Sequence, residues 1–316
     1  MRRGRAAAES LRRTVRFAAE VEELGYHRFW VAEHHGVPGV AGAAPTALAA
    51  AVASATSRIR VGTGGVMLPN HPPLVVAEQF GVLEALHPER IDVGVGRSLG
   101  FTSAVREALG SGREAAERFG EQLAELLGYF EGTEQVSAVP SEGVRLPVFV
   151  LATGAGAGHA ARAGLPLVIA GVRGDQVLLE AIQQYREEFR PSTWACEPYV
   201  VLSRSVAVAE TSEQARALLV PEAWSTACSR LRGVFPPLEP AEDVLGRSLS
   251  RWEQEQFERA MRGHVFGTED EVADQLQSLV DETGADEVLV TTSGYDQRAL
   301  LDSYRRLARL IPDDRS

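Results

Sequence analysis

Seven short apolar segments, rich in Val, Ile and Leu, recur along the chain and predict β-strands. Several are continuously apolar, which is typical of parallel strands that helices cover on both faces. The segments are RFWVAE (28–33), IRVGTGGVM (59–67), RIDVGVG (90–96), PVFVLAT (147–153), PLVIAG (166–171), PYVVLSRSVAVA (198–209) and DEVLVTT (286–292).

The segments between these strands carry helical patterns, among them PLVVAEQFGVLEAL, SEQARALL and TEDEVADQLQSLVDETG. In the last of them Thr268 is suited to the N-cap, Glu271 completes a capping box, and Gly284 ends the helix. Repeated strand–helix units without a linker predict an α/β fold, either a (β/α)8 TIM barrel or a doubly wound sheet.

Two longer segments interrupt this alternation, at about 98–146 and 221–263. On a barrel such insertions usually extend the loops around the active-site mouth. The first helix, AAESLRRTVRFAAEVEELG, begins almost at Met1, so a closed barrel has its first strand missing or truncated. MRRGRAAAES is too basic and too small to fill a buried strand position, so upstream residues or another segment must fill it. We expect one domain over 1–316.

Composition narrows the class of protein. Of 316 residues, 45% are hydrophobic, and 32 Lys and Arg against 43 Asp and Glu give a net charge of −11, which argues against nucleic acid or an anionic membrane as a partner. No apolar run is long enough to span a bilayer or to complete a signal peptide, so we expect a cytoplasmic protein. The two cysteines, Cys196 and Cys228, lack the spacing of a zinc site or a disulfide framework.

WVAEHHGVPG (30–39) places Glu33, His34 and His35 at the end of the first predicted strand. The carboxyl ends of barrel strands form the active-site face, and a neutral histidine there can accept and return a proton. Successive residues on a strand point to opposite faces, so His34 and His35 make a poor pair of metal ligands, and we predict no metal. In a purely structural interpretation, one histidine caps the strand and the other is solvated.

Two further strand ends carry candidate binding residues. Gly64 and Gly65 lie in GTGG, where missing side chains let a planar ring approach the backbone, although a β-bulge explains them nearly as well. Arg97 follows IDVGVG, where a guanidinium can bind a phosphate or simply form a surface salt bridge.

VLATGAGAGHAARAG (150–164) resembles a dinucleotide-binding turn, with Asp175 near the position of an acidic ribose ligand. We reject that interpretation because the following helix is too short, the third glycine is misplaced and the motif comes late in the chain. In a barrel, the same loop offers backbone N–H groups that suit a monophosphate.

From about Leu24 onward, the sequence resembles the bacterial luciferase-like monooxygenases. The resemblance rests on LGYHRFWVAEHH, ATSRIRVGTGGVMLPNHPPLVVAEQFGVLEALHPERIDVGVGR, REEFRP, EPYVVLSRSVAVAETSEQAR, VFGTEDEVADQL and TGADEVLVTT, in the family's order. It implies a (β/α)8 TIM barrel and a two-component enzyme that uses reduced FMN from a separate flavin reductase, together with O2, to oxidise a small organic substrate. It also implies a homodimer.

The resemblance also implies roles for individual residues. His34 and Glu33 are the predicted catalytic residues: His34 serves in acid/base work, and Glu33 lies near the flavin ring. A non-proline cis peptide is expected near Gly64 and Gly65. The phosphate of FMN is held by Arg97 and by the loop after the next strand, whose first residues are Thr153, Gly154 and Ala155.

Two departures from the family pattern bear on FMN. The phosphate loop is usually rich in serine, whereas here only Thr153 keeps a hydroxyl, and SLGFTS follows Arg97 where Pro-Gly-Thr-Asp is common. Each neutral hydrogen bond contributes ~1 kcal/mol, so losing two weakens FMN binding about tenfold or more. Two alternatives therefore stay open, a non-catalytic flavin-binding protein and an oxidoreductase that uses the deazaflavin F420. The sequence does not distinguish between an aldehyde and a polycyclic secondary metabolite as the substrate.

Overall fold

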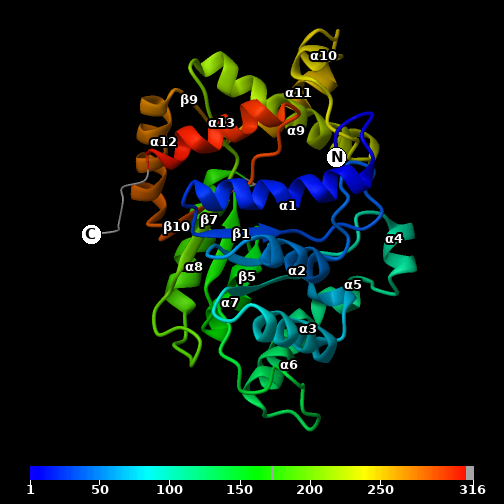
Figure 1. The fold of residues 1–316 in the computed structure, drawn as a ribbon, viewed down its shortest axis with the longest axis vertical. Coiled ribbons are helices and arrows are strands. Elements are labelled where there is room, and N and C mark those ends of the chain that lie inside the picture. Colours follow the sequence, from blue (N-terminus) through cyan, green and yellow to red (C-terminus); the bar gives the residue numbers. More distant parts are fainter. Residues whose placement is uncertain (172–173, 311–316) are drawn as a thin grey trace. The chain divides into compact units, whose positions relative to one another are not determined.

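A computed structural model describes residues 1–171 and 174–310 (Figure 1). Contacts divide the chain into two compact units. Unit 1 comprises Met1–Tyr26, Val37–Ala41 and Leu202–Ser316, and unit 2 comprises His27–Gly36 and Gly42–Val201. Whether the chain acts as a single barrel domain stays a prediction.

Unit 2 is built on a parallel sheet in the order β1-β2-β4-β5-β6-β7, with β3 paired to β4. Strand β7 continues from unit 2 into unit 1. Strand interiors such as Val93 and Val150 are almost completely buried, as expected of parallel strands. The strands are β1 (Arg28–Val31), β2 (Arg60–Thr63), β3 (Val66–Met67), β4 (Ile91–Gly96), β5 (Val148–Ala152), β6 (Leu167–Ala170) and β7 (Val200–Arg204).

The helices of unit 2 follow the strands along the chain and cover the sheet (Figure 1). Proline begins both α2 and α3, where its missing N–H costs nothing, and the buried face of α3 includes Val76, Phe80 and Leu83. The helices are α2 (Pro45–Ala55), η1 (Leu68–Asn70), α3 (Pro73–Leu86), α4 (Ser103–Ala108), α5 (Arg113–Glu117), α6 (Phe119–Glu131), α7 (Ala157–Ala163) and α8 (Asp175–Glu188).

Unit 1 contains the short parallel pair β8-β9, and β10 lies beside the second half of β7. The capping box of Thr268 and Glu271 is present, and Gly284 ends its helix at φ 58°, so these predictions are confirmed. The elements are α1 (Ala7–Glu23), β8 (Val206–Val208), α9 (Ser212–Arg232), α10 (Ala241–Leu245), α11 (Arg251–Met261), β9 (Val265–Gly267), α12 (Glu269–Thr283), β10 (Glu287–Val290) and α13 (Gln297–Ala308).

All seven predicted strand segments contain strands, but two are divided. The segment 59–67 forms β2 and β3, and 198–209 forms β7 and β8. Strand β9 was not predicted, and the segment 221–263 begins inside α9 rather than after it.

No strand precedes α1 among the described residues, in agreement with the prediction of a missing first strand. The sheet path therefore begins at β1 and ends at β10. Arg2 forms only an isolated bridge with Leu238 in unit 1. Of the helices within the described ranges, none combines the length and apolar character needed to cross a membrane.

A fully buried carboxylate connects three neighbouring strands of unit 2. Asp92 on β4 accepts from Arg28 (2.7 Å) and the Trp30 indole (2.9 Å) on β1, and from Arg60 on β2 (2.8 Å). The Arg28 guanidinium also lies 5.0 Å from the centre of the Phe149 ring on β5. A buried charge requires such pairing, because an isolated carboxylate would have lost its hydration without compensation.

The substitution Asp92→Asn is expected to lower the free energy of unfolding by about 3–5 kcal/mol, because it leaves two guanidinium groups without their buried counter-charge. Urea unfolding followed by circular dichroism measures this. The exposed pair of Arg118 and Glu121 offers the control, since Glu121→Gln should change stability by less than about 1 kcal/mol. Equal effects of the two substitutions would contradict the proposed importance of Asp92.

Candidate active site

The predicted site residues of unit 2 lie after the carboxyl ends of four strands that are adjacent in the sheet. Glu33 and His34 follow β1, Gly64 and Gly65 follow β2, and Arg97 follows β4. The loop Thr153–Gly156 follows β5. Adjacent strands are about 4.8 Å apart, so the set spans roughly 14 Å along one edge of the sheet.

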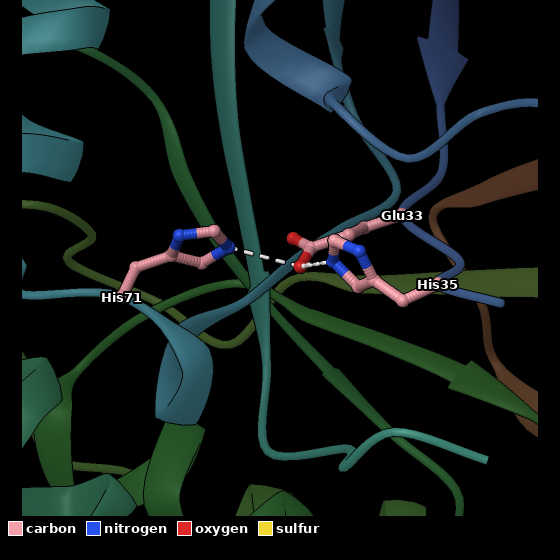
Figure 2. A group of neighbouring side chains, drawn as sticks. All are labelled: Glu33, His35 and His71. Carbon is pink, nitrogen blue, oxygen red and sulfur yellow. Dashed lines mark hydrogen bonds and ion pairs between the residues drawn. The ribbon is translucent and has the colours of Figure 1, made fainter. Parts of the chain in front are cut away.

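Glu33 is the centre of a hydrogen-bonded cluster (Figure 2). Its Oε1 lies 2.6 Å from Nε2 of His35 and 2.9 Å from Nε2 of His71, while its Oε2 accepts from the backbone N–H of Met67 at 2.8 Å. The Nδ2 of Asn70 is 3.4 Å from Oε1. Glu33 thus holds the chain after β2 against the end of β1.

Burial alone would raise the pKa of Glu33, but the hydrogen bonds from His71, Met67 and His35 outweigh it and the pKa is lowered. The carboxylate is therefore ionised at neutral pH, although its side chain is completely buried.

His34 lies outside this cluster. Its backbone N–H donates to the carbonyl of Gly42 (2.8 Å), and no described residue hydrogen-bonds its imidazole. His34 is exposed at its surface, but the neighbouring protein atoms still lower its pKa by desolvation; the Glu33 carboxylate opposes this, and His35 adds to it. His34 is therefore a neutral imidazole at neutral pH, able to accept a proton.

His71 is the residue that sequence reasoning missed. The argument against a metal considered only the adjacent His34 and His35, whereas the structure brings His71 from the turn after η1 to the same carboxylate oxygen as His35. Ligand atoms of Glu33, His35 and His71 lie within 4.8 Å of one another, a donor set that also suits a divalent transition metal.

The peptide bond between Gly64 and Gly65 is cis, as predicted. On either side of this bond, Gly62 of β2 pairs with Asp92 of β4, and Val66 of β3 pairs with Val95 of β4. The chain through β2 and β3 thus advances four residues while β4 advances three. This extra residue is the register offset of a β-bulge, which agrees with the structural explanation of these glycines and leaves their role in binding a planar ring a prediction. At this interruption of the backbone pairing, the Thr63 hydroxyl takes the place of backbone partners for Gly94. It donates to the Gly94 carbonyl (2.7 Å) and accepts from the Gly94 N–H (3.1 Å).

Arg97 and the loop after β5 are brought together. A Cβ built on Gly156 would lie 3.9 Å from Cδ of Arg97. Burial lowers the pKa of His159, and the nearby Arg162 and Arg97 guanidinium groups lower it further, which indicates positive charge beside the loop. The backbone N–H groups of Gly154, Ala155 and Gly156 donate to no residue within the described ranges.

The parallel sheet, its covering helices and these strand-end residues define an α/β fold with a candidate site at the carboxyl edge of the sheet. A family model described as luciferase-like monooxygenase matches residues 2–287, and the chain belongs to this family. It is 34% identical to the luciferase-like monooxygenase of Escherichia coli (strain K12) over 95% of this chain and 91% of the relative. It is 33% identical to the N-acetyl-S-alkylcysteine monooxygenase of Bacillus subtilis (strain 168), over 87% and 85% of the two chains.

Solved structures support the fold. Apo-MsnO8 is 34% identical, with a TM-score of 0.86 over 98% of this chain and 95% of that one. The FMN-bound oxygenating constituent of Pseudomonas putida 3,6-diketocamphane monooxygenase (17%, TM-score 0.75, 99% and 96%) and an F420-dependent secondary alcohol dehydrogenase (15%, TM-score 0.72, 95% and 94%) share the fold. The prediction of an α/β fold of the luciferase-like TIM-barrel type is confirmed.

The two glycines at the bulge should respond differently to alanine. A Cβ on Gly65 would lie 2.7 Å from the Gly94 carbonyl oxygen, which is too close for an unshifted backbone, whereas one on Gly64 would lie 3.4 Å from Cβ of Trp30. Gly65→Ala is expected to cost about 1–3 kcal/mol of stability by overpacking, and Gly64→Ala much less. Chemical denaturation of both variants measures this, and equal losses would contradict it.

Proposed function

We propose that the protein is the oxygenating component of a two-component monooxygenase, which takes reduced FMN from a separate flavin reductase and oxidises a small organic substrate with O2. The observation that carries the proposal is the arrangement of Arg97 beside Gly156 and its uncommitted backbone donors, on the same sheet edge as His34.

The residues present fit a flavin mononucleotide. Arg97 and the N–H groups of Gly154 and Ala155 supply charge and donors for a phosphate, and the Thr153 hydroxyl adds one more partner. Nearer to β1, the buried Oδ1 of Asn70 has no donor among the described residues, so a ligand N–H or O–H would satisfy it.

When bound, reduced FMN would supply the electrons that activate O2 for transfer of one oxygen atom to the substrate. The protein's own contribution is to orient the ligand through Arg97 and the phosphate loop and to move a proton through His34. Glu33 does not compete for that proton, because it is ionised and already accepts several hydrogen bonds.

F420 is the competing cofactor, because a structural neighbour is named as an F420-dependent dehydrogenase. That neighbour is 15% identical and indicates only the fold, so F420 is tested beside reduced FMN as the alternative cofactor. The N-acetyl-S-alkylcysteine monooxygenase suggests a thioether as a substrate class to test beside aldehydes. The substrate itself, the reductase and a cytoplasmic location stay predictions.

A homodimer also belongs to this proposal. Val75, Val82 and Leu86 are exposed on one face of α3, at the spacing of a helical stripe. A second copy of the chain packed there would remove this apolar surface from water.

Arg97→Gln is expected to weaken binding of reduced FMN roughly 10- to 100-fold, because a charge-assisted hydrogen bond contributes about 1.5–3 kcal/mol. Anaerobic fluorescence or calorimetric titration with reduced FMN and with F420 measures the affinities, and O2 uptake in the presence of a flavin reductase measures turnover. Arg118→Gln, an exposed guanidinium paired with Glu121, is the matched control. Tighter binding of F420 than of reduced FMN, or no O2 uptake, would reject the proposal.

The pH dependence tests the role of His34. Since its pKa is lowered from the ordinary value of 6.5, His34 stays neutral at and above pH 6.5, and the rate should fall only at more acidic pH, where it becomes protonated. His34→Asn is expected to lower kcat/KM about 10²- to 10⁴-fold and to remove this acidic limb. The measurement is the pH profile of product formation with whichever thioether or aldehyde is turned over, and His87→Asn is the control. An unchanged acidic limb in His34→Asn would rule out this role.

A further inference from the structure

Two histidines from separate segments of unit 2 converge on one carboxylate oxygen (Figure 2). His35 lies in the loop after β1, while His71 lies 36 positions later in the turn between η1 and α3. Both present Nε2 to Oε1 of Glu33, at 2.6 and 2.9 Å. The Nδ1 atoms of both rings have no hydrogen-bond partner within the described ranges, and both rings are partly exposed.

The protonation of this cluster follows from counting donors. An ionised carboxylate can only accept hydrogen bonds, so each imidazole must carry its proton on Nε2. A protonated carboxyl would donate to one of the two rings, whereas the donors from Met67, Asn70 and the other ring favour the ionised form, which accepts hydrogen bonds from all of them. The ionised form satisfies every one of these contacts at once.

We propose that Glu33 is a positioning residue, which fixes His35 and His71 as Nε2–H tautomers and leaves Nδ1 of each ring as its proton-accepting atom. Sequence reasoning assigned Glu33 a catalytic role and His71 none. In this arrangement the acid transfers no proton itself, and His35 and His71 join His34 as candidate bases at the same sheet edge.

The assignment of the tautomers does not depend on the proposed function. The role of the two histidines as proton acceptors in catalysis rests on it. If FMN chemistry is correct, a proton released near the ends of β1 and β2 can be taken up by Nδ1 of His35 or His71. The nitrogen that faces Glu33 is unavailable, because its lone pair is replaced by the N–H that the carboxylate accepts.

Nitrogen NMR of the full-length protein, labelled with ¹⁵N-histidine, tests the proposal. Long-range ¹H–¹⁵N correlation spectra at neutral pH distinguish the two tautomers, and His35→Gln and His71→Gln assign the signals. We expect Nε2–H with an unprotonated Nδ1 for both rings, and a mixture of tautomers for both in Glu33→Ala. The wild-type spectrum decides the tautomer even if Glu33→Ala does not fold.

A matched pair of substitutions separates positioning from proton transfer. The amide nitrogen of His71→Gln can reach the place of Nε2 and keep the bond to Glu33, whereas that of His71→Asn reaches only the place of Nδ1. His71→Gln should therefore retain the thermal midpoint and His71→Asn should lower it, while both lose Nδ1 as a hydrogen-bond acceptor. His87→Asn, outside the cluster, should show neither effect.

Three results would overturn the proposal. They are an Nδ1–H tautomer of either ring in the wild type, unchanged tautomers in a folded Glu33→Ala variant, and one equivalent of a transition metal that co-purifies and is lost in His71→Gln. The last result would mean that the three atoms are metal ligands. Each of these results is obtained with the protein alone and does not require FMN to bind, and failure to bind FMN would leave the tautomers unchanged.

Discussion

The burial of one carboxylate, Asp92, is the constraint on which the parallel sheet of unit 2 depends. Parallel strands lie side by side without a hairpin to fix their register, so the side chains must supply that information. Asp92 does so because only one alignment lets it accept from Arg28 and Trp30 on β1 and from Arg60 on β2 together. A shift of one residue would turn the carboxylate to the other face and leave buried charges unpaired.

That alignment at the amino-terminal half of the strands determines what meets at their carboxyl ends. With β1, β2, β4 and β5 in register, the residues that follow them lie along one edge, where a bulge and a short turn add His71. The chemistry of the site is thus separated from the residues that hold the strands together. Glu33 is the exception, because it belongs to both.

Much of this was predictable from local pattern. Apolar runs identified the strands, and the cap of α12 followed from Thr268, Glu271 and Gly284 because their physical roles depend on neighbours in sequence. The same strand pattern predicted that His34, Arg97 and the loop Thr153–Gly156 follow strand ends, which is where the structure has them. The divisions within two strands were not visible, because in each case a threonine hydroxyl stands in for backbone partners, Thr63 at Gly94 and Thr292 at Val206. His71 was missed because its partner Glu33 is 38 positions away and no periodicity connects them.

The bond from the Met67 amide to Glu33 makes one side chain serve both scaffold and chemistry. Replacement of Glu33 during evolution would change the protonation of two imidazoles. The same mutation would leave the Met67 N–H, beside the bulge, without its acceptor. Divergence toward new substrates is therefore easier through the loops that approach the sheet edge than through this position. Glu33 constrains the evolution of the site because its loss would lower the stability of the fold as well as change the chemistry.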